Sequence, residues 1–220
     1  MLNPLGQIYA YFSARRLKKN HPYQSKMPVL CVGNLSVGGV GKTPVCLALG
    51  AFLRQQGKRF YYLNHGYKAR QQSVLVDMAV HTALEVGDEA LLLAQKAPTI
   101  VDSARARGAQ LAENLGADCL IMDDGFQNPS LVKTFSFVVV DGRLGFGNER
   151  VLPAGPLREP VLRGLKRADA LILVGQDTWG VRDYLKENKV DLPLLTGAFY
   201  PDQASLKVFE KAPRIGAFAG

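Results

Sequence analysis

The sequence GNLSVGGVGKT at residues 33–43 decides the fold of this chain, because it joins two predicted elements. The apolar run before it, residues 29–32, predicts a buried strand, and residues 44–56 predict a helix. Gly38, Gly39 and Gly41 leave the backbone free to take positive φ angles. A strand, a glycine-rich loop and a helix in this order predict a P-loop, whose backbone N–H groups surround phosphate oxygens at a helix N-terminus.

The end of this motif carries side chains for nucleotide chemistry. We predict that Lys42 reaches the β- and γ-phosphates of ATP and acts in catalysis, and that the Thr43 hydroxyl binds Mg²⁺. Ser36 replaces the first glycine of the G-x-x-x-x-G-K-[ST] pattern, but the other glycines keep the loop open. The residues predicted to bind the phosphates are Ser36, Val37, Gly38, Gly39, Val40, Gly41, Lys42 and Thr43.

Two carboxylates follow another apolar run. Residues 119–122 predict a strand, and Asp123 and Asp124 come directly after it. In P-loop proteins an aspartate at the end of a second strand holds Mg²⁺. By itself the pair fits an Asp-Asp-Gly turn without a ligand equally well. With a P-loop in the same chain, we predict that both aspartates bind the metal.

A third acidic position, Asp88, lies in Gly87-Asp88-Glu89 at the start of a predicted helix over residues 89–95. Taken alone, Asp88 fits the role of an N-cap. A phosphoryl-transfer enzyme also needs a carboxylate that positions the acceptor hydroxyl and takes its proton. Asp88 is therefore a candidate catalytic base.

Short apolar runs alternate with helical stretches along the chain. Strands are predicted at residues 29–32, 60–63, 99–101, 119–122, 135–140, 170–174 and 194–199, and helices at residues 44–56, 89–95, 103–115 and 179–187. Runs that are apolar throughout indicate strands covered on both faces. We therefore predict a P-loop NTPase-like α/β fold, with a mostly parallel, doubly wound sheet and helices on both faces. Residues 141–168, rich in Gly and Pro, predict a long irregular loop with a functional role.

Positive charge is concentrated at the amino end. The chain has 220 residues with 27 basic and 19 acidic side chains, a net charge of +8, and five basic but no acidic residues lie in the first 26 positions. Apolar residues at spacings of three and four run along the same segment: Leu2, Leu5, Ile8, Tyr9 and Phe12. The pattern predicts a basic amphipathic helix, which either lies in a membrane interface or packs on its own domain.

The same composition excludes several classes of protein. The hydrophobic fraction of 47% argues against a disordered chain, and no apolar run is long enough to span a bilayer. The order of basic and apolar residues at the amino end does not fit a secretory signal, so we expect the protein to remain in the cytoplasm. No motif indicates nucleic-acid binding. Cys31, Cys46 and Cys119 lie in apolar runs without C-x-x-C spacing, and we predict them to be core residues.

The motifs, taken in order, resemble those of the tetraacyldisaccharide 4'-kinases of the lipid A pathway in Gram-negative bacteria. They are residues 33–44, His65-Gly66-Tyr67, Gly87-Asp88-Glu89, Asp123-Asp124-Gly125-Phe126-Gln127 and the stretch LPAGPLREP at residues 152–160. The resemblance covers nearly the whole chain. It departs from the family at His65, where arginine is usual, and at Asn128, where histidine is common.

The resemblance implies a reaction and a role for each matching residue. The γ-phosphate of ATP would pass to the 4'-hydroxyl of an acylated glucosamine disaccharide 1-phosphate, giving lipid IVA. Asp88 matches the family's catalytic aspartate, and Arg158 and Glu159 would shape the site. The resemblance also implies peripheral attachment to the cytoplasmic face of the inner membrane, and we expect no obligate protein partner.

Three parts of the chain follow from this reading. We predict a membrane-associating helix at residues 1–26, a kinase domain at 27–200, and a linker with the start of a second domain at 201–220. The family's catalytic histidine, implied to lie beyond this point, has no counterpart in the sequence. We therefore expect binding of ATP and Mg²⁺ with reduced or absent kinase activity. The alternative is a nucleotide-binding fragment or a membrane-associated P-loop ATPase without lipid kinase turnover.

Two further motifs suggest rival functions. Asn188-Lys189-Val190-Asp191 fits the guanine-reading Asn-Lys-x-Asp pattern of GTPases, but a helical segment precedes it where an apolar strand is required. The Gly-Gly-Val-Gly-Lys-Thr sequence also resembles membrane-partitioning ATPases. Those proteins carry a signature lysine before the two glycines, where this chain has Val37.

Overall fold

The computed structural model describes residues 6, 10, 11, 15, 21–67 and 69–200. Most of the predicted amino-terminal helix over residues 1–26, and the whole of the predicted segment 201–220, lie outside the described residues. Among the residues that are described, no helix combines the length and apolar character needed to cross a membrane.

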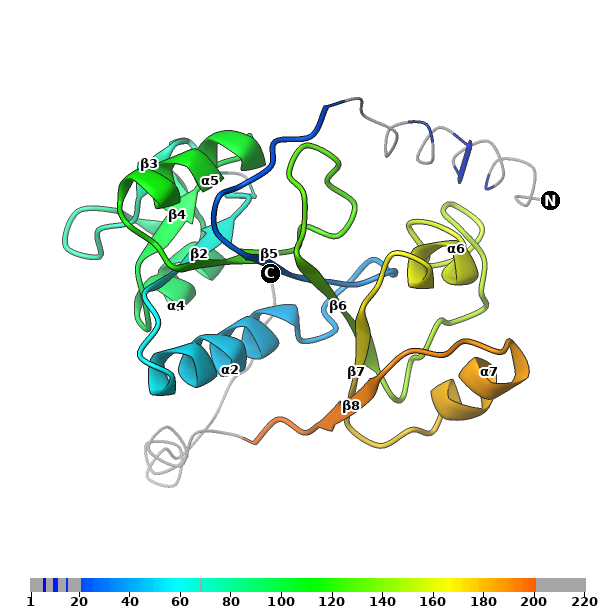
Figure 1. The fold of residues 1–220 in the computed structure, drawn as a ribbon. Coiled ribbons are helices and arrows are strands. Elements are labelled where there is room, and N and C mark those ends of the chain that lie inside the picture. The colour runs from blue at the N-terminus through cyan, green and yellow to red at the C-terminus, as the bar shows by residue number, and fades with distance from the viewer. Residues whose placement is uncertain (1–5, 7–9, 12–14, 16–20, 68, 201–220) are drawn as a thin grey trace, which may run out of the picture.

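The described chain forms one eight-stranded sheet (Figure 1). In chain order its strands are β1 (Val29–Gly33), β2 (Phe60–Asn64), β3 (Val74–Leu75), β4 (Thr99–Val101), β5 (Cys119–Asp123), β6 (Phe135–Asp141), β7 (Ala170–Val174) and β8 (Leu194–Gly197). Across the sheet the order is β3-β4-β2-β5-β1-β6-β7-β8. Only the β3–β4 pair is antiparallel. The carboxyl ends of β1 and β5 therefore lie next to each other, with Val32 opposite Asp123.

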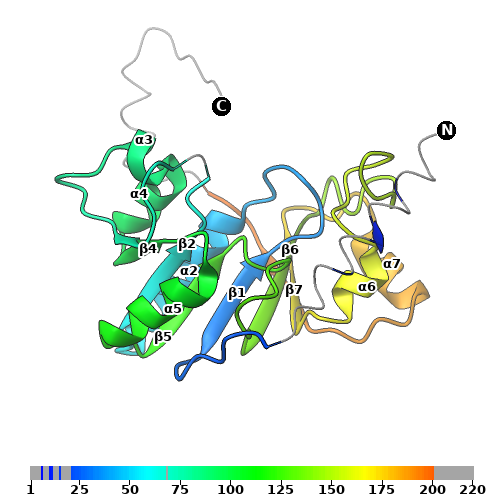
Figure 2. The ribbon, with the colours of Figure 1, turned by 90° about the horizontal axis from the view of Figure 1, so that it is seen from above.

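Helices cover both faces of this sheet (Figures 1 and 2). The helices are α2 (Lys42–Gln55), α3 (Ala83–Val86), α4 (Asp88–Ala94), α5 (Arg105–Asn114), α6 (Val161–Leu165) and α7 (Val181–Glu187). α2 and α4 pack on one face, where Cys46 and Leu93 join the core. α5, α6 and α7 pack on the other face, together with the β5–β6 connection. The fold agrees with the predicted doubly wound α/β architecture.

Burial explains why the strands were visible in the sequence. All five residues of β5 are buried, and four of the five in β1 are. Such strands carry continuous apolar runs because neither face meets water. Cys31, Cys46 and Cys119 are buried with free thiols, which confirms their prediction as core residues.

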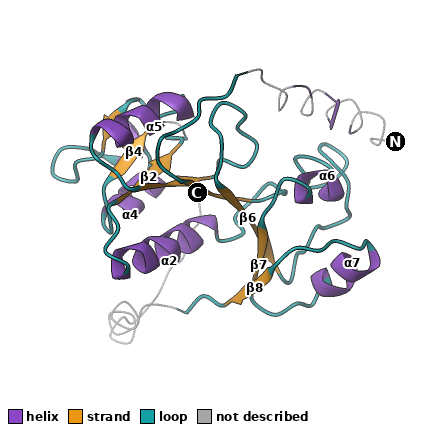
Figure 3. Ribbon diagram, viewed as in Figure 1, coloured by secondary structure: helices purple, strands orange, loops and turns teal. Residues whose placement is uncertain are grey.

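The structure adds three short elements that the sequence did not predict and shortens one predicted strand. The predicted irregular loop over residues 141–168 contains α6, and Figure 3 shows this helix after a long stretch of loop. With only five residues, α6 is too short for its pattern to be recognised. The predicted strand at 194–199 ends at Gly197. The two-residue strand β3 and the four-residue helix α3 were not predicted.

Candidate functional site

The phosphate loop runs from the end of β1 to the start of α2. Gly38 and Gly41 have φ angles of 106° and 85°, which L-residues with a side chain rarely adopt. A Cβ atom at Gly38 or Gly39 would meet nothing within 4 Å, so the loop faces open space there. The backbone therefore lies exposed at the N-terminus of a 14-residue helix, where an anion is stabilised.

The stretch LPAGPLREP, residues 152–160, pairs with the backbone of the phosphate loop. The Val37 N–H donates to Pro156 O over 2.8 Å, and the Arg158 N–H donates to Leu35 O over 2.7 Å. Ser36 and Leu157 form an antiparallel bridge between these contacts. The motif thus supports the phosphate loop as a short added strand would.

Thr43 and Asp123 meet at the neighbouring ends of α2 and β5. The Thr43 hydroxyl donates to Asp123 Oδ2 over 3.2 Å, and Asn64 Nδ2 lies 3.4 Å from the same oxygen. Asp123 Oδ1 is buried and has no hydrogen-bond partner in the described part of the chain. A buried carboxylate oxygen without a partner, beside a hydroxyl, fits the oxygen ligands that Mg²⁺ prefers.

The environment of Asp123 also fits a cation. Burial, followed by the negative charges of Glu89 and Asp124, raises its pKa to about 6, while Lys42 and the Thr43 hydroxyl act in the opposite direction. A cation bound at Asp123 would offset the cost of the buried charge. Sequence reasoning missed Glu89, which brings a third carboxylate to this edge of the sheet.

Asp124 lies between two cations. Its carboxylate is 3.8 Å from Lys42 Nζ and 3.1 Å from Arg158 Nη1. Its φ angle of 49° turns the chain sharply after β5. Asp124 thus stands beside the phosphate loop, as predicted, but its contacts are with Lys42 and Arg158. Its role as a metal ligand stays a prediction.

Asp88 is the first residue of α4, and its N-cap is Gly87. The alternative that Asp88 itself caps the helix is therefore wrong. Its carboxylate accepts the N–H of Glu89 over 3.0 Å, and the side chain is exposed. Because the charge of the adjacent Glu89 acts on Asp123, α4 begins close to the phosphate site.

Two further residues at this site carry no signal in the sequence. Arg105 is 1% exposed and donates to the backbone oxygens of Leu63 and Asp123, which ties the ends of β2 and β5 together. The ring of Phe199 lies against Gly41, where an added Cβ would come within 2.3 Å of it. Both contacts join residues that are distant in sequence, so no local sequence pattern predicts them.

The Asn-Lys-x-Asp sequence lies far from this site. Asn188 is the C-cap of α7, and the motif precedes the amino end of β8. The phosphate loop lies at the carboxyl ends of the parallel strands. The motif is therefore at the opposite edge of the sheet, which excludes a guanine-reading role.

Comparison with known proteins agrees with this geometry. A family model described as LpxK, tetraacyldisaccharide-1-P 4'-kinase, matches residues 1–220. Relatives named tetraacyldisaccharide 4'-kinase are 47% identical over 221 residues in Rhodospirillum centenum and 48% identical over 222 residues in Dinoroseobacter shibae. These alignments cover 100% of this chain but 64% and 65% of the relatives, so the chain spans slightly less than two thirds of their length.

Solved structures show the same fold. The "apo" form of LpxK from Aquifex aeolicus in complex with ATP is 25% identical, with a TM-score of 0.69 over 92% of this chain and 84% of that one. The signal recognition particle receptor FtsY from Elizabethkingia anophelis is 16% identical, with a TM-score of 0.51 over 90% of this chain and 68% of that one. The second likeness concerns the fold alone.

Proposed function

Because this chain belongs to the family of tetraacyldisaccharide-1-P 4'-kinases, we propose that it holds the ATP and Mg²⁺ site of a lipid 4'-kinase. The observation that carries the proposal is the contact of Thr43 with Asp123, whose other carboxylate oxygen is buried without a partner. The named relatives support phosphoryl transfer to a tetraacyldisaccharide, and the structure of the Aquifex aeolicus relative contains ATP.

The phosphate loop binds the nucleotide in this proposal. Backbone N–H groups of residues 38–43 donate to the phosphate oxygens, since the Val37 N–H already donates to Pro156 O, and Lys42 neutralises charge on the transferred group. Thr43, Asp123 and Asp124 hold Mg²⁺, which screens the negative charge of the phosphates. Phe199, against Gly41, offers an aromatic surface beside the loop for the purine ring.

Asp88 acts on the acceptor. It accepts the proton of the acceptor's 4'-hydroxyl as that oxygen forms a bond to the γ-phosphorus of ATP, and the bond from this phosphorus to the β,γ-bridging oxygen breaks to release ADP. The exposed side chain of Asp88 is accessible to a bulky acceptor. Lys42 and Arg158, which contact Asp124, supply two positive charges beside the phosphate loop that can stabilise the negative charge of the transferred group.

The chemistry of the acceptor and the sequence of the amino-terminal segment support attachment to a membrane. An acylated disaccharide resides in a bilayer, and the basic, amphipathic character of residues 1–26 suits the anionic surface of the inner membrane on its cytoplasmic side. Sedimentation with phosphatidylglycerol vesicles tests this. Binding should weaken strongly when Arg15, Arg16, Lys18 and Lys19 are all changed to Gln.

Two measurements on the purified chain test the proposed function. Calorimetry with ATP and Mg²⁺ should show binding that Lys42→Ala weakens strongly. Transfer of labelled γ-phosphate to tetraacyldisaccharide 1-phosphate, which we expect to be reduced in this chain, should be lost entirely in Asp88→Asn, while ATP binding is kept. An exposed acid in α7, Asp183, provides the matched control Asp183→Asn. ATP binding without any transfer would favour the alternative of a nucleotide-binding unit, and no ATP binding would overturn both.

A further inference from the structure

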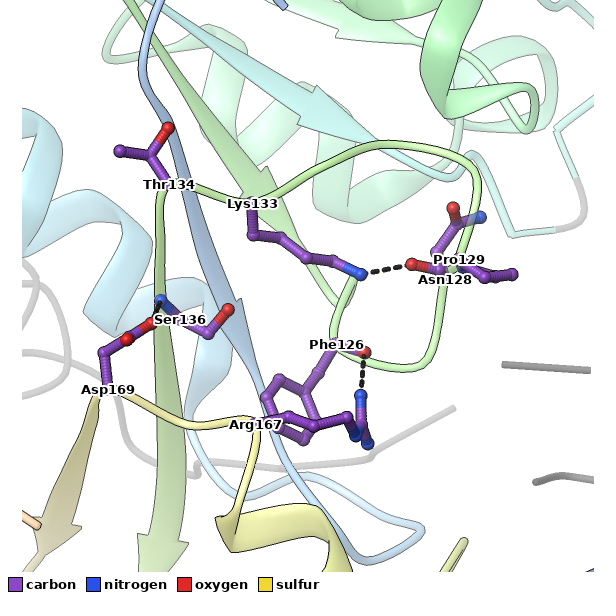
Figure 4. Close-up of a pocket in the computed structure, with 8 residues that line it drawn as sticks. All are labelled: Phe126, Asn128, Pro129, Lys133, Thr134, Ser136, Arg167 and Asp169. Atoms are coloured by element: carbon purple, nitrogen blue, oxygen red, sulfur yellow. Dashed lines mark hydrogen bonds between the residues drawn. The ribbon is translucent and has the colours of Figure 1, made fainter. Parts of the chain in front are cut away.

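A cavity of about 340 Å³ lies where the connection from β5 to β6 crosses the sheet (Figure 4). β1 separates these two strands, so residues 124–134 pass over β1, and they do so without a helix. The polar residues that line the cavity are Asn128, Lys133, Thr134, Ser136, Arg167 and Asp169. No residue of the phosphate loop is among its lining residues.

Lys133 brings a positive charge to this cavity. Its Nζ donates to the backbone oxygen of Asn128, which uses one of three N–H donors. Within the described ranges, no carboxylate lies in salt-bridge contact with it. Burial, and then the charges of Arg167 and Arg105, lower its pKa, although Cys31 and Glu159 act in the opposite direction. The ammonium therefore has spare donors and no direct counter-ion.

Arg167 forms a fixed wall of the cavity. Its Nη2 donates to Glu159 Oε1 over 2.5 Å, and its Nη1 donates to Phe126 O over 3.1 Å. The guanidinium also lies over the Phe126 ring, 4.4 Å from the ring centre. Its charge is thus balanced by Glu159, and its position is set by the crossing chain. Lys133 remains the uncompensated cation.

Two hydroxyls and a carboxylate complete the lining, on the opposite side of the cavity from Arg167 and Asn128 in Figure 4. Ser136 is 4% exposed, yet its hydroxyl bonds to no described residue. Thr134 Oγ1 accepts the Val29 N–H over 3.0 Å, which leaves its own proton to donate. Asp169 Oδ2 accepts the Ser136 N–H over 2.7 Å, which leaves Oδ1 as an acceptor.

We infer that this cavity binds a phosphate monoester that also carries free hydroxyl groups, such as a sugar phosphate. It would be a second phosphate site, apart from the phosphate loop. Lys133 and the hydroxyls of Ser136 and Thr134 donate to the phosphate oxygens. Asp169 accepts from a ligand hydroxyl. The source of the group is either a free sugar phosphate or the sugar 1-phosphate of the lipid acceptor. The site goes beyond the proposed kinase activity, and its test does not require turnover.

Calorimetric titration of the whole chain with glucosamine 1-phosphate tests the site. We expect Lys133→Gln to weaken binding by about tenfold and Ser136→Ala by about threefold, since each removes donors to a charged ligand. Lys166→Gln, on an exposed lysine outside the cavity lining, is the matched control and should change nothing. Ser136→Ala should keep the melting temperature, because no described residue bonds to the hydroxyl. No binding by the wild type, or equal binding by all variants, overturns the inference.

Three comparisons separate this site from its alternatives. Lys42→Ala should still bind glucosamine 1-phosphate. If Lys42→Ala lost this binding while Lys133→Gln kept it, the phosphate loop would be the binding site and the inference would be overturned. Inorganic phosphate should bind to the wild type more weakly than glucosamine 1-phosphate does, and Asp169→Asn should remove this difference. Equal affinities of the wild type for the two ligands would overturn the role given to the hydroxyl groups of the ligand. Weaker binding of the lipid acceptor by Ser136→Ala than by the wild type supports the site with the acceptor as its source, and unchanged binding supports it with a free sugar phosphate.

Discussion

β1 and β5 lie side by side, and the connections that follow them start at the same edge of the sheet. Residues 34–41 lead from β1 into the 14-residue helix α2, whose apolar side chains cover one face. Residues 124–134 lead from β5 back across the other face to β6 without a helix. The first connection carries the nucleotide-binding motif, and the second carries the cavity.

The two connections are stabilised by different interactions. α2 satisfies its own backbone and needs its neighbours mainly for apolar packing. The β5–β6 connection has no helical hydrogen bonds, so side chains bind its backbone instead. Lys133, from the connection itself, donates to Asn128 O, and the distant Arg167 donates to Phe126 O. This crossover without a helix therefore depends on polar side-chain contacts, and the polar cavity lies beside it.

Removing the lysine of the first connection should have the largest effect. Lys42→Ala should lower the affinity for ATP and Mg²⁺ by a factor of about a hundred or more, because two charge-assisted hydrogen bonds contribute about 1.5–3 kcal/mol each and a tenfold change corresponds to about 1.4 kcal/mol. Lys58→Ala, on an exposed lysine after α2, is the control and should bind ATP normally. Calorimetry measures both. Equal affinities would show that the phosphate loop is not the nucleotide site.

The second connection contacts Gly33, the last residue of β1 before the first connection, and a substitution there gives the next largest effect. A Cβ at Gly33 would lie 2.4 Å from Phe126 Cβ, and backbone atoms of Phe126 stand directly behind it. Gly33→Ala should therefore destabilise the fold by about 1–3 kcal/mol through overpacking. Gly39→Ala places its Cβ in open space, and its melting temperature should stay close to that of the wild type. Thermal unfolding of both variants tests this prediction. An equal fall in melting temperature for the two variants would mean that the contact between Gly33 and Phe126 is not tight.

The difference between the connections also explains how far the sequence was informative. The phosphate loop was recognisable because a strand, glycines and a helix follow one another within residues 29–56. All seven predicted strands and the parallel architecture are present, because buried strands carry continuous apolar runs. The second connection was visible only through Asp124 and the family motif that continues to Gln127. Glu159 was named only through the resemblance, and Arg167 was not predicted. Their contacts with Gln127 and Phe126 span more than 30 residues, and local pattern does not encode such contacts.

Glu159 tests the dependence of the second connection on distant side chains. It is 2% exposed and accepts from Gln127 Nε2 over 3.1 Å as well as from Arg167. Glu159→Gln removes the charge that balances Arg167, and we expect a loss of about 1–2 kcal/mol in unfolding free energy. Hydrogen exchange should show a loss of amide protection at residues 126–133 and no loss of protection in α2.

A surface pair provides the control for this change. Arg59 and Asp118 are 3.2 Å apart and largely exposed, so solvent screens their attraction. Asp118→Asn should therefore alter stability much less than Glu159→Gln. Equal protection changes in α2 and in the β5–β6 connection would contradict the view that buried polar contacts support only the latter.

The smallest expected effect concerns a third support of the second connection, Tyr23. Its backbone pairs with this connection at Ser130 and Val132, and its hydroxyl donates to Glu113 Oε2 over 2.8 Å. Ser25 donates to the other oxygen of the same carboxylate over 2.7 Å. Burial opposes ionisation of Glu113, but these hydrogen bonds more than offset it and lower its pKa below the ordinary 4.5.

This lowered pKa fixes the direction of a pH dependence. A carboxyl group with a depressed folded-state pKa stabilises the fold above its unfolded-state pKa of 4.5, and the contribution is lost as the pH falls through the folded-state value. Glu113→Gln should therefore be less stable than the wild type by under about 1 kcal/mol near neutral pH, as expected for a half-exposed group. Urea unfolding should show this difference shrinking as the pH falls below about 4.5. A difference that stays constant with pH would mean that the shape of the side chain, and not its charge, holds Tyr23 to the connection.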